Sequence, residues 1–183
     1  MNGDSANVRW FSWIYDTILP IGPWYQNGRD VRAAMRVCTP ITIRYGETDM
    51  MGVVYHANYL LYFEDARTAF LEAIGYPYAR IEEAGFMSPV THMECDYREP
   101  LRYGEGAVVR TRVVSSRPTK TVYAYEVFRE GQDRDVEKPC CTGRSTHCLV
   151  DAATFKPVSL KRCLPDLYGR YAEVLEPDEG EGR

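Results

Sequence analysis

The sequence predicts an α+β fold in which a curved antiparallel sheet of five strands wraps around one long central helix. Residues 58–74 carry the strongest amphipathic helix pattern of the chain. Five stretches rich in Val, Thr and Tyr are typical of strands, namely 38–45, 89–97, 106–116, 119–130 and 141–151. One strand precedes the helix and four follow it, and we expect those four to form a meander. Because a single helix covers only one face of such a sheet, a second copy is expected to cover or extend the other.

The size and composition of the chain narrow its class. It has 183 residues and a net charge of −4, which suits one domain with an appendage and gives no overall attraction to nucleic acid. Its six cysteines show no C-x-x-C spacing, so we expect free thiols rather than a zinc site or a disulfide framework. No apolar run reaches the ~18 residues of a membrane span. Asp4 and Asp16 also interrupt any signal-peptide pattern, so a cytoplasmic location is expected.

Residues 1–37 differ from the rest and are expected to form an aromatic-rich helical extension. An apolar stripe at helical spacing consists of Phe11, Ile14, Tyr15, Ile18 and Leu19. We expect this helix to pack on the main domain or on a partner subunit. Its tryptophans would also suit a membrane interface, although few Lys or Arg residues lie on it. The main domain is expected at 38–160. Residues 161–183 are expected to hold a short helix and an acidic tail, 176–183, that is disordered.

The connections around the long helix carry their own signals. Asn58 is expected to cap its start, and Gly75 to end it in a left-handed conformation. Residues 76–88 are expected to be a turn-rich connection, and Arg117-Pro118 a tight hairpin. The buried face of the helix is predicted to consist of Tyr59, Phe63, Ala66, Phe70, Ala73 and Ile74.

The loop before the helix holds the residues that could perform chemistry. Asp49 lies between Gly46 and Gly52, where a carboxylate can face a pocket, and His56 directly precedes the helix. Backbone N–H groups at a helix start lack intrahelical partners and would stabilise a developing oxyanion. This set suits hydrolysis of an activated acyl group. Taken alone, however, an aspartate before a helix is more often a cap or turn residue, and a lone histidine is more often structural.

The full string from Tyr45 to Arg67, YGETDMMGVVYHANYLLYFEDAR, decides between these interpretations. It closely resembles the hot-dog-fold acyl-CoA thioesterases, in particular the 4-hydroxybenzoyl-CoA thioesterase and YbgC-like group. The shared pattern is a tyrosine, an acidic residue and a threonine before the aspartate, then D-x-x-G-x-V-Y-H-A-N-Y, then an acidic residue and an arginine on the helix. The resemblance extends over about residues 38–158, and does not cover the first 37 residues or the acidic tail.

The resemblance implies roles for particular residues. Asp49 matches the catalytic carboxylate, as nucleophile or general base, and His56 matches the histidine of the YbgC-like branch. The backbone N–H of His56 matches the donor that polarises the thioester carbonyl, and Asn58 matches the helix-start asparagine. Gly52 belongs to the same motif. The resemblance also implies homodimers or homotetramers with the active site at the subunit interface. No metal or bound cofactor is implied, because CoA is part of the substrate.

Further residues are expected to support the site. Tyr45 is expected to line it or hydrogen-bond within it, and Glu64 to orient a neighbour or pair with Arg67. The acyl pocket is expected to be lined by the helix face, including Tyr59 and Phe63. Candidates for the CoA phosphates are Arg117 and Lys120.

Two alternatives are open beside the thioesterase. One is a non-catalytic module that binds acyl-CoA, and the other is a different hot-dog enzyme such as a dehydratase. The intact Asp49 argues against the first, and the D-x-x-G string before the helix fits thioester hydrolysis better than the second. Neither the acyl group nor the choice between dimer and tetramer follows from the sequence.

Overall fold

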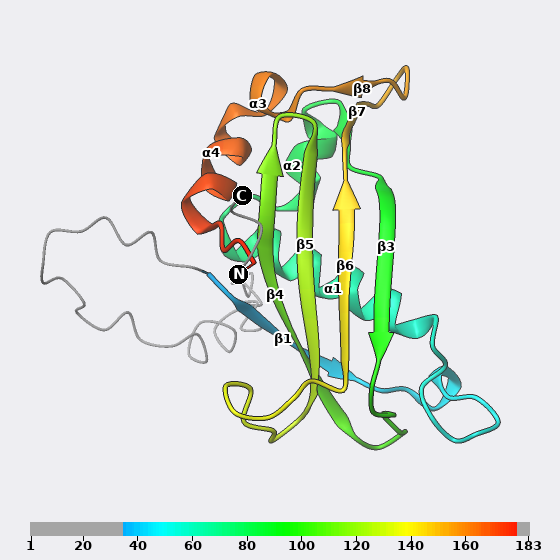
Figure 1. The fold of residues 1–183 in the computed structure, drawn as a ribbon. Coiled ribbons are helices and arrows are strands. Elements are labelled where there is room, and N and C mark those ends of the chain that lie inside the picture. The colour runs from blue at the N-terminus through cyan, green and yellow to red at the C-terminus, as the bar shows by residue number, and fades with distance from the viewer. Residues whose placement is uncertain (1–34, 179–183) are drawn as a thin grey trace, which may run out of the picture. The chain divides into compact units, whose positions relative to one another are not determined.

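The computed structural model describes residues 35–178, and its main sheet has five antiparallel strands in the order β1-β4-β5-β6-β3 (Figure 1). The strands are β1 (Val37–Thr42), β3 (Val90–Tyr97), β4 (Gly106–Arg117), β5 (Lys120–Arg129) and β6 (Cys141–His147). One long helix, α1 (Asn58–Ala73), packs against one face of the sheet, here called the inner face. The predicted α+β class and its hot-dog arrangement are confirmed.

The strand order corrects the predicted meander. Strands β4, β5 and β6 pair in sequence, but β3 pairs with β6 instead of β4, and β4 pairs with β1. The reason lies in composition. The strands β4 and β5 are mostly buried and take the middle of the sheet, whereas β3 presents exposed polar residues such as His92 and Glu94 that suit an edge.

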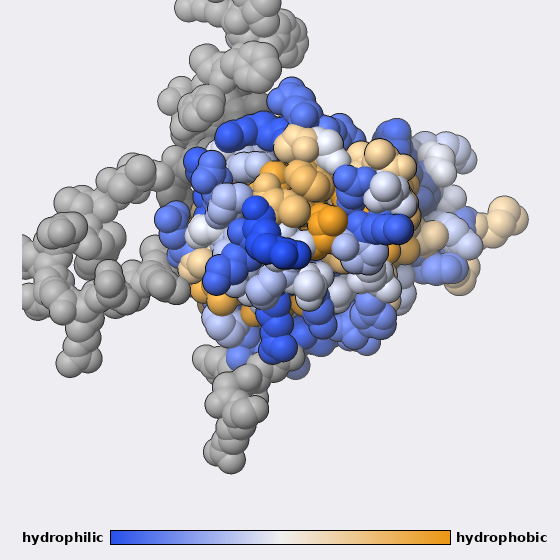
Figure 2. Space-filling model, turned by 90° about the horizontal axis from the view of Figure 1, so that it is seen from above, coloured by the Kyte–Doolittle hydropathy of each residue, from blue (hydrophilic) through white to orange (hydrophobic). Residues whose placement is uncertain are grey.

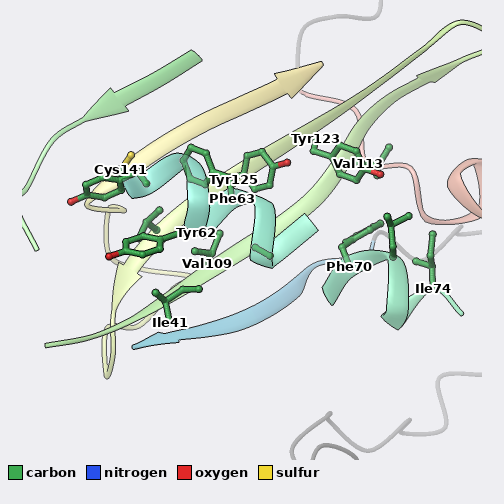
Figure 3. Close-up of a cluster of buried hydrophobic side chains, with 14 of the residues drawn as sticks. Ile41, Tyr62, Phe63, Phe70, Ile74, Val109, Val113, Tyr123, Tyr125 and Cys141 are labelled. Atoms are coloured by element: carbon green, nitrogen blue, oxygen red, sulfur yellow. The ribbon is translucent and has the colours of Figure 1, made fainter. Parts of the chain in front are cut away.

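The core lies between α1 and the inner face of the sheet. The ring of Phe63 stacks on that of Tyr125, with ring centroids 4.5 Å apart, and Phe70 meets Tyr123 edge to face (Figure 3). Gly143 of β6 permits this close packing, because a Cβ atom there would lie 2.4 Å from Cε2 of Phe63. A bare backbone at this point therefore sets how closely the helix approaches the sheet.

The boundaries of α1 also differ from expectation. Asn58 is the first helical residue rather than the cap, and its Nδ2 donates to the Glu47 carbonyl oxygen at 2.8 Å. Ala73 is exposed, while Tyr62 and Leu71, absent from the predicted face, are buried. A wider stripe of the helix is therefore buried than the prediction assumed, and Ile74, directly after the helix, is buried as predicted. Gly75 ends the helix at φ +71°, as predicted.

Several short elements were not predicted. The connection 76–88 contains helix α2 (Tyr78–Glu83) and strand β2 (Phe86–Met87). The predicted strand 141–151 divides, and its end forms β7 (Leu149–Asp151), which pairs with β2 and β8 (Pro157–Val158) in a small second sheet. The predicted terminal helix is two helices, α3 (Leu160–Cys163) and α4 (Pro165–Val174). The break between them follows from Pro165, which starts α4. A one-turn 3-10 helix, η1 (Tyr45–Glu47), opens the loop before α1.

The C-terminal segment corrects another expectation. Residues 176–178 were predicted to be disordered, but they lie on the face of the sheet opposite α1, here called the outer face. Arg112 donates to the Glu176 carbonyl oxygen at 2.8 Å and to Oδ1 of Asp178 at 2.5 Å, and Arg36 pairs with the Glu176 carboxylate. Arginines from separate parts of the chain thus order an acidic segment whose own sequence predicts disorder.

The expected helix within residues 1–37 lies almost wholly outside the described residues, as do residues 179–183. Between residues 35 and 178, the structure contains no helix that is long and apolar enough to cross a membrane.

Candidate active site

The site is built on residues 45–57, here called the Asp49 loop, which folds as a narrow hairpin. Thr48 bridges Val54, and the Asp49 N–H donates to the Val53 carbonyl oxygen at 2.9 Å. At the tip, Oδ1 of Asp49 accepts the Met51 N–H at 2.8 Å, and Gly52 closes the turn at φ +70°. Asp49 is half-buried, and no other described group pairs with its carboxylate. It therefore serves as a turn residue and still presents a free carboxylate oxygen.

The start of α1 follows directly after this hairpin. Between residues 35 and 178, no acceptor is found for the backbone N–H groups of His56, Ala57 and Tyr59, here called the helix-start amides. Ala57 caps α1 and Tyr59 lies in its first turn, so their N–H groups are among those that an α-helix leaves open at its positive end, and His56 directly precedes them. The His56 ring is exposed and lies against Tyr55, with ring centroids 4.3 Å apart. This end of α1 can therefore receive a partial negative charge.

Glu47 was not singled out by the sequence, yet it joins the Asp49 loop to α1. Only 7% of this glutamate is exposed, and its carboxylate accepts from the Tyr62 hydroxyl of α1. Burial raises the pKa of the Glu47 carboxyl, but hydrogen bonds from the Arg44 backbone, the Tyr62 hydroxyl and the Arg44 guanidinium outweigh it, so the pKa is lowered. The buried Glu47 carboxylate therefore carries a negative charge between the Asp49 loop and α1.

The connection between β3 and β4 supports the other side of the loop. The Val54 N–H donates to the carbonyl oxygen of Leu101 at 2.8 Å, and Arg102 donates to that of Gly52 at 3.3 Å. The ring of Tyr103 meets that of Tyr45 edge to face at 5.4 Å. Tyr45 is largely exposed, and its expected role in lining the site stays a prediction.

Arg117 and Lys120 lie elsewhere. They flank the β4–β5 hairpin, at the end of the sheet opposite the Asp49 loop, which is the cyan segment at the lower right of Figure 1. Lys120 lines a small cavity with His147 and Leu160 there. Figure 2 looks onto this end and shows an apolar patch ringed by hydrophilic residues. Within one chain the structure does not bring these two cations to Asp49, because β4 runs away from that end of the sheet and turns into β5 at the far end.

The predicted site residues on α1 differ in their exposure and contacts. Glu64 is exposed, and among the described residues no ion pair joins it to Arg67, which instead lies over the Tyr78 ring at 5.8 Å. The expected pair is therefore not formed. Tyr59 is buried against Tyr97, and burial raises the pKa of the Tyr59 hydroxyl to about 12.

Phe63 has no exposed surface in one chain, because it fills the space between Tyr125 and Gly143. Its predicted contact with an acyl group stays a prediction.

Two supporting residues were missed for different reasons. Glu47 was visible as the acidic residue of the motif, but an acidic loop residue gives no sign of burial. Tyr97 ends the edge strand β3, and only the fold brings it to the helix start. In the part of the chain that the structure describes, no cluster of His, Cys, Asp or Glu could hold a metal ion.

Comparison with known proteins assigns the chain to a protein family. A sequence profile of the Thioesterase-like superfamily matches residues 43–168, which include the Asp49 loop, α1 and the whole sheet from β3 onwards. The chain belongs to this superfamily.

Individual relatives agree with that assignment. YneP of Bacillus subtilis, whose name assigns it provisionally as an acyl-CoA thioesterase, is 39% identical over 73% of this chain and 94% of its own length. The acyl-CoA thioester hydrolase YbgC of Escherichia coli O6:H1 is 30% identical over 48% of this chain and 66% of its own. The crystal structure of DHNA-CoA thioesterase from Staphylococcus aureus is 37% identical, with a TM-score of 0.70, and the match covers 76% of this chain and 90% of that one.

Proposed function

We propose that this thioesterase-superfamily protein hydrolyses an acyl-CoA to the free acid and CoA. The observation that carries the proposal is that the Asp49 loop presents a half-buried carboxylate, leads directly into the helix-start amides and is tied to α1 by hydrogen bonds. Relatives named for acyl-CoA and DHNA-CoA hydrolysis support the substrate class.

In the proposed reaction, the thioester carbonyl oxygen lies at the helix-start amides, which stabilise the oxyanion of the tetrahedral intermediate. Asp49 has two chemically consistent roles. It attacks the carbonyl carbon to form an anhydride that water then opens, or it removes a proton from a water molecule that attacks directly. His56 holds the water or assists the proton transfer. In both routes the thiolate of CoA leaves and is protonated.

We further propose that the working enzyme is a cytoplasmic homodimer or homotetramer that needs no metal or cofactor. Large apolar side chains near Asp49 are exposed in the single chain, among them Met50, Met51 and Tyr55. A second copy would cover them and complete the acyl pocket around Tyr59 and Phe63. If Arg117 and Lys120 bind CoA phosphates, they do so across such an interface. Within one chain, Arg102 is a cation that contacts the tip of the Asp49 loop, at the Gly52 carbonyl oxygen.

The test is release of free CoA thiol from a panel of aromatic and fatty acyl-CoAs by the wild type and Asp49→Asn. Asparagine keeps the side-chain oxygen that accepts the Met51 N–H, so the turn survives while the charge is lost. A matched control is Asp133→Asn, since Oδ1 of Asp133 accepts the N–H two residues ahead, at Asp135, in the same way. We expect Asp49→Asn to lose activity by a factor on the order of 10² or more, and Asp133→Asn to keep it.

Full activity in Asp49→Asn would contradict the proposed mechanism. Tight acyl-CoA binding without hydrolysis across the panel would instead favour a non-catalytic acyl-CoA-binding module.

A further inference from the structure

We propose that Glu47 is a positioning residue that fixes the Asp49 loop against the first two turns of α1, and so sets the place of Asp49 relative to the helix-start amides. The inference rests on the proposed function and adds a residue to its machinery. Glu47 does not touch the substrate in this scheme, and it acts through Asp49 and through the helix.

The side chain of Glu47 makes one half of the connection. Its Oε2 accepts the Tyr62 hydroxyl at 2.9 Å and the Arg44 backbone N–H at 2.9 Å, and its Oε1 accepts Nε of Arg44 at 2.7 Å. Tyr62 lies in the second turn of α1 and is 2% exposed. The carboxylate is therefore held from two sides, by Arg44, which directly precedes η1, and by Tyr62 of the helix.

The backbone of Glu47 makes the other half. Its carbonyl oxygen accepts Nδ2 of Asn58 at 2.8 Å and the Tyr55 N–H at 2.8 Å. Asn58 is the first residue of α1. A single residue thus binds the first helical turn through its peptide and the second through its side chain, which removes both sliding and tilting of the loop along the helix.

The charge state fits this role. Because the hydrogen bonds lower the pKa of Glu47, its carboxyl is ionised near neutral pH and can only accept hydrogen bonds. The Tyr62 hydroxyl must then be the donor. Charge-assisted hydrogen bonds of this kind are shorter and stronger than neutral ones, so the connection is stiff.

The position of Glu47 in the chain transmits that stiffness to Asp49. The two residues are separated only by Thr48, whose side chain hydroxyl is itself fixed to the Tyr45 carbonyl oxygen at 2.9 Å. A displacement of about 1 Å in a reacting group can lower a rate on the order of 10²-fold. Loss of the Glu47 connection should therefore appear in kcat rather than in substrate binding.

The experiment compares Glu47→Ala, Glu47→Gln and Tyr62→Phe with the wild type, using the acyl-CoA that the wild type cleaves fastest. We expect Glu47→Ala to lower kcat by about 10-fold to 100-fold, with KM changed less than about threefold. Glutamine keeps an acceptor for Tyr62 and the shape of the side chain, so it should restore part of kcat. The double variant Glu47→Ala/Tyr62→Phe should lose less than the product of the two single losses, because each single variant already removes the contact between these two side chains.

The matched control is Glu126→Gln. Glu126 is also a partly buried carboxylate that accepts from an arginine, with Nε of Arg110 2.9 Å away, but it lies on β5 and points to the outer face. Its kcat should equal that of the wild type. Thermal unfolding of each variant, read by circular dichroism, separates lost positioning from lost folding, since a structural role lowers Tm without changing kcat per folded molecule.

A kcat within twofold of the wild type in folded Glu47→Ala would overturn the inference. If Glu47→Ala does not fold, Tyr62→Phe decides, because it keeps the Arg44 contacts and removes only the side-chain contact between Glu47 and the second turn of α1. In that case a wild-type kcat in Tyr62→Phe overturns the inference, and a lowered kcat at unchanged KM supports it. Asp49→Asn is measured in parallel. Its full activity overturns the proposed function, whereas an inactive Asp49→Asn beside a fully active Glu47→Ala overturns this inference alone.

Discussion

The hydroxyl of Tyr97 donates a hydrogen bond to the carbonyl oxygen of His56, 3.0 Å away. Tyr97 ends the edge strand β3, while His56 immediately precedes α1, so this bond links the edge of the sheet to the helix start. The peptide between His56 and Ala57 is planar, and its N–H points opposite to its C=O. A fixed His56 carbonyl therefore also fixes the direction of the Ala57 N–H, one of the helix-start amides.

Tyr97→Phe is accordingly expected to lower kcat by about 3-fold to 10-fold, since it removes this orientation but leaves the N–H groups themselves. The measurement is steady-state release of CoA thiol. Tyr168→Phe on α4 serves as the control and should match the wild type. Equal kcat values for both variants would show that the helix start holds its own geometry.

Gly143→Ala is expected to destabilise the fold by about 1–3 kcal/mol, because the added Cβ would lie 2.4 Å from the Phe63 ring. Urea unfolding measures the loss. Gly169→Ala in α4 is the control, since no described atom lies within 4 Å of its Cβ position, and it should be neutral or stabilising. Adding Phe63→Leu to Gly143→Ala should recover part of the loss, and the absence of any recovery would contradict this account of the contact.

His147 is expected to make the fold sensitive to acid. It is 2% exposed, and burial, followed by the nearby charge of Arg67, lowers its pKa to about 4. The folded protein therefore keeps His147 neutral, while the unfolded chain takes up a proton below about pH 6.5. Stability attributable to this residue is complete above pH 6.5. It falls by about 1.4 kcal/mol per pH unit down to about pH 4, where both states are protonated.

Urea midpoints at pH 7 and pH 5 test this expectation. The difference between them should shrink in His147→Gln and persist in His92→Gln, because His92 is exposed on β3. The same pH difference in all three proteins would assign the acid sensitivity to other groups.

Cys95 is expected to be an unusually reactive thiol. Its Sγ lies 3.3 Å from that of Cys141, and the hydrogen bond from Cys141, which outweighs burial, lowers the Cys95 pKa to about 7. Iodoacetamide should therefore label Cys95 with a rate midpoint near pH 7, as followed by mass spectrometry. Cys140, whose pKa is raised by burial, should lag in the same digest. Cys141→Ala should move the Cys95 midpoint to higher pH, and an unchanged midpoint would contradict the role of Cys141.

The parts of the fold that follow from local pattern were predictable. The stripe of α1, the left-handed Gly75 and the hairpin after Arg117 each depend on neighbouring residues only. The place of β3 was not predictable, because strand order is decided by pairing between segments that are far apart in the sequence. The same holds for residues 176–178. Their order depends on Arg112 of β4 and on Arg36, which directly precedes β1.

The candidate site divides in the same way. The turn at Asp49 could be inferred, since an aspartate followed by a glycine three residues later is a local turn signal. The burial of Glu47 could not, because its partner Tyr62 is 15 residues away and the loop around it is polar. Arg117 and Lys120 were chosen for their charge and their place beside the predicted hairpin, and neither property says which end of a strand faces the site.

The contacts between residues 176–178 and the outer face have a practical consequence for shortened versions of this protein. The Glu176 N–H donates to the Val113 carbonyl oxygen of β4, and its carboxylate pairs with Arg36, just ahead of the edge strand β1. Truncation after Val174 would strip the carboxylates from Arg36 and Arg112 and turn a neutralised surface into a cationic one. Such a protein would adsorb to polyanions during purification, and β1 would fray at the end where Arg36 now pairs with Glu176.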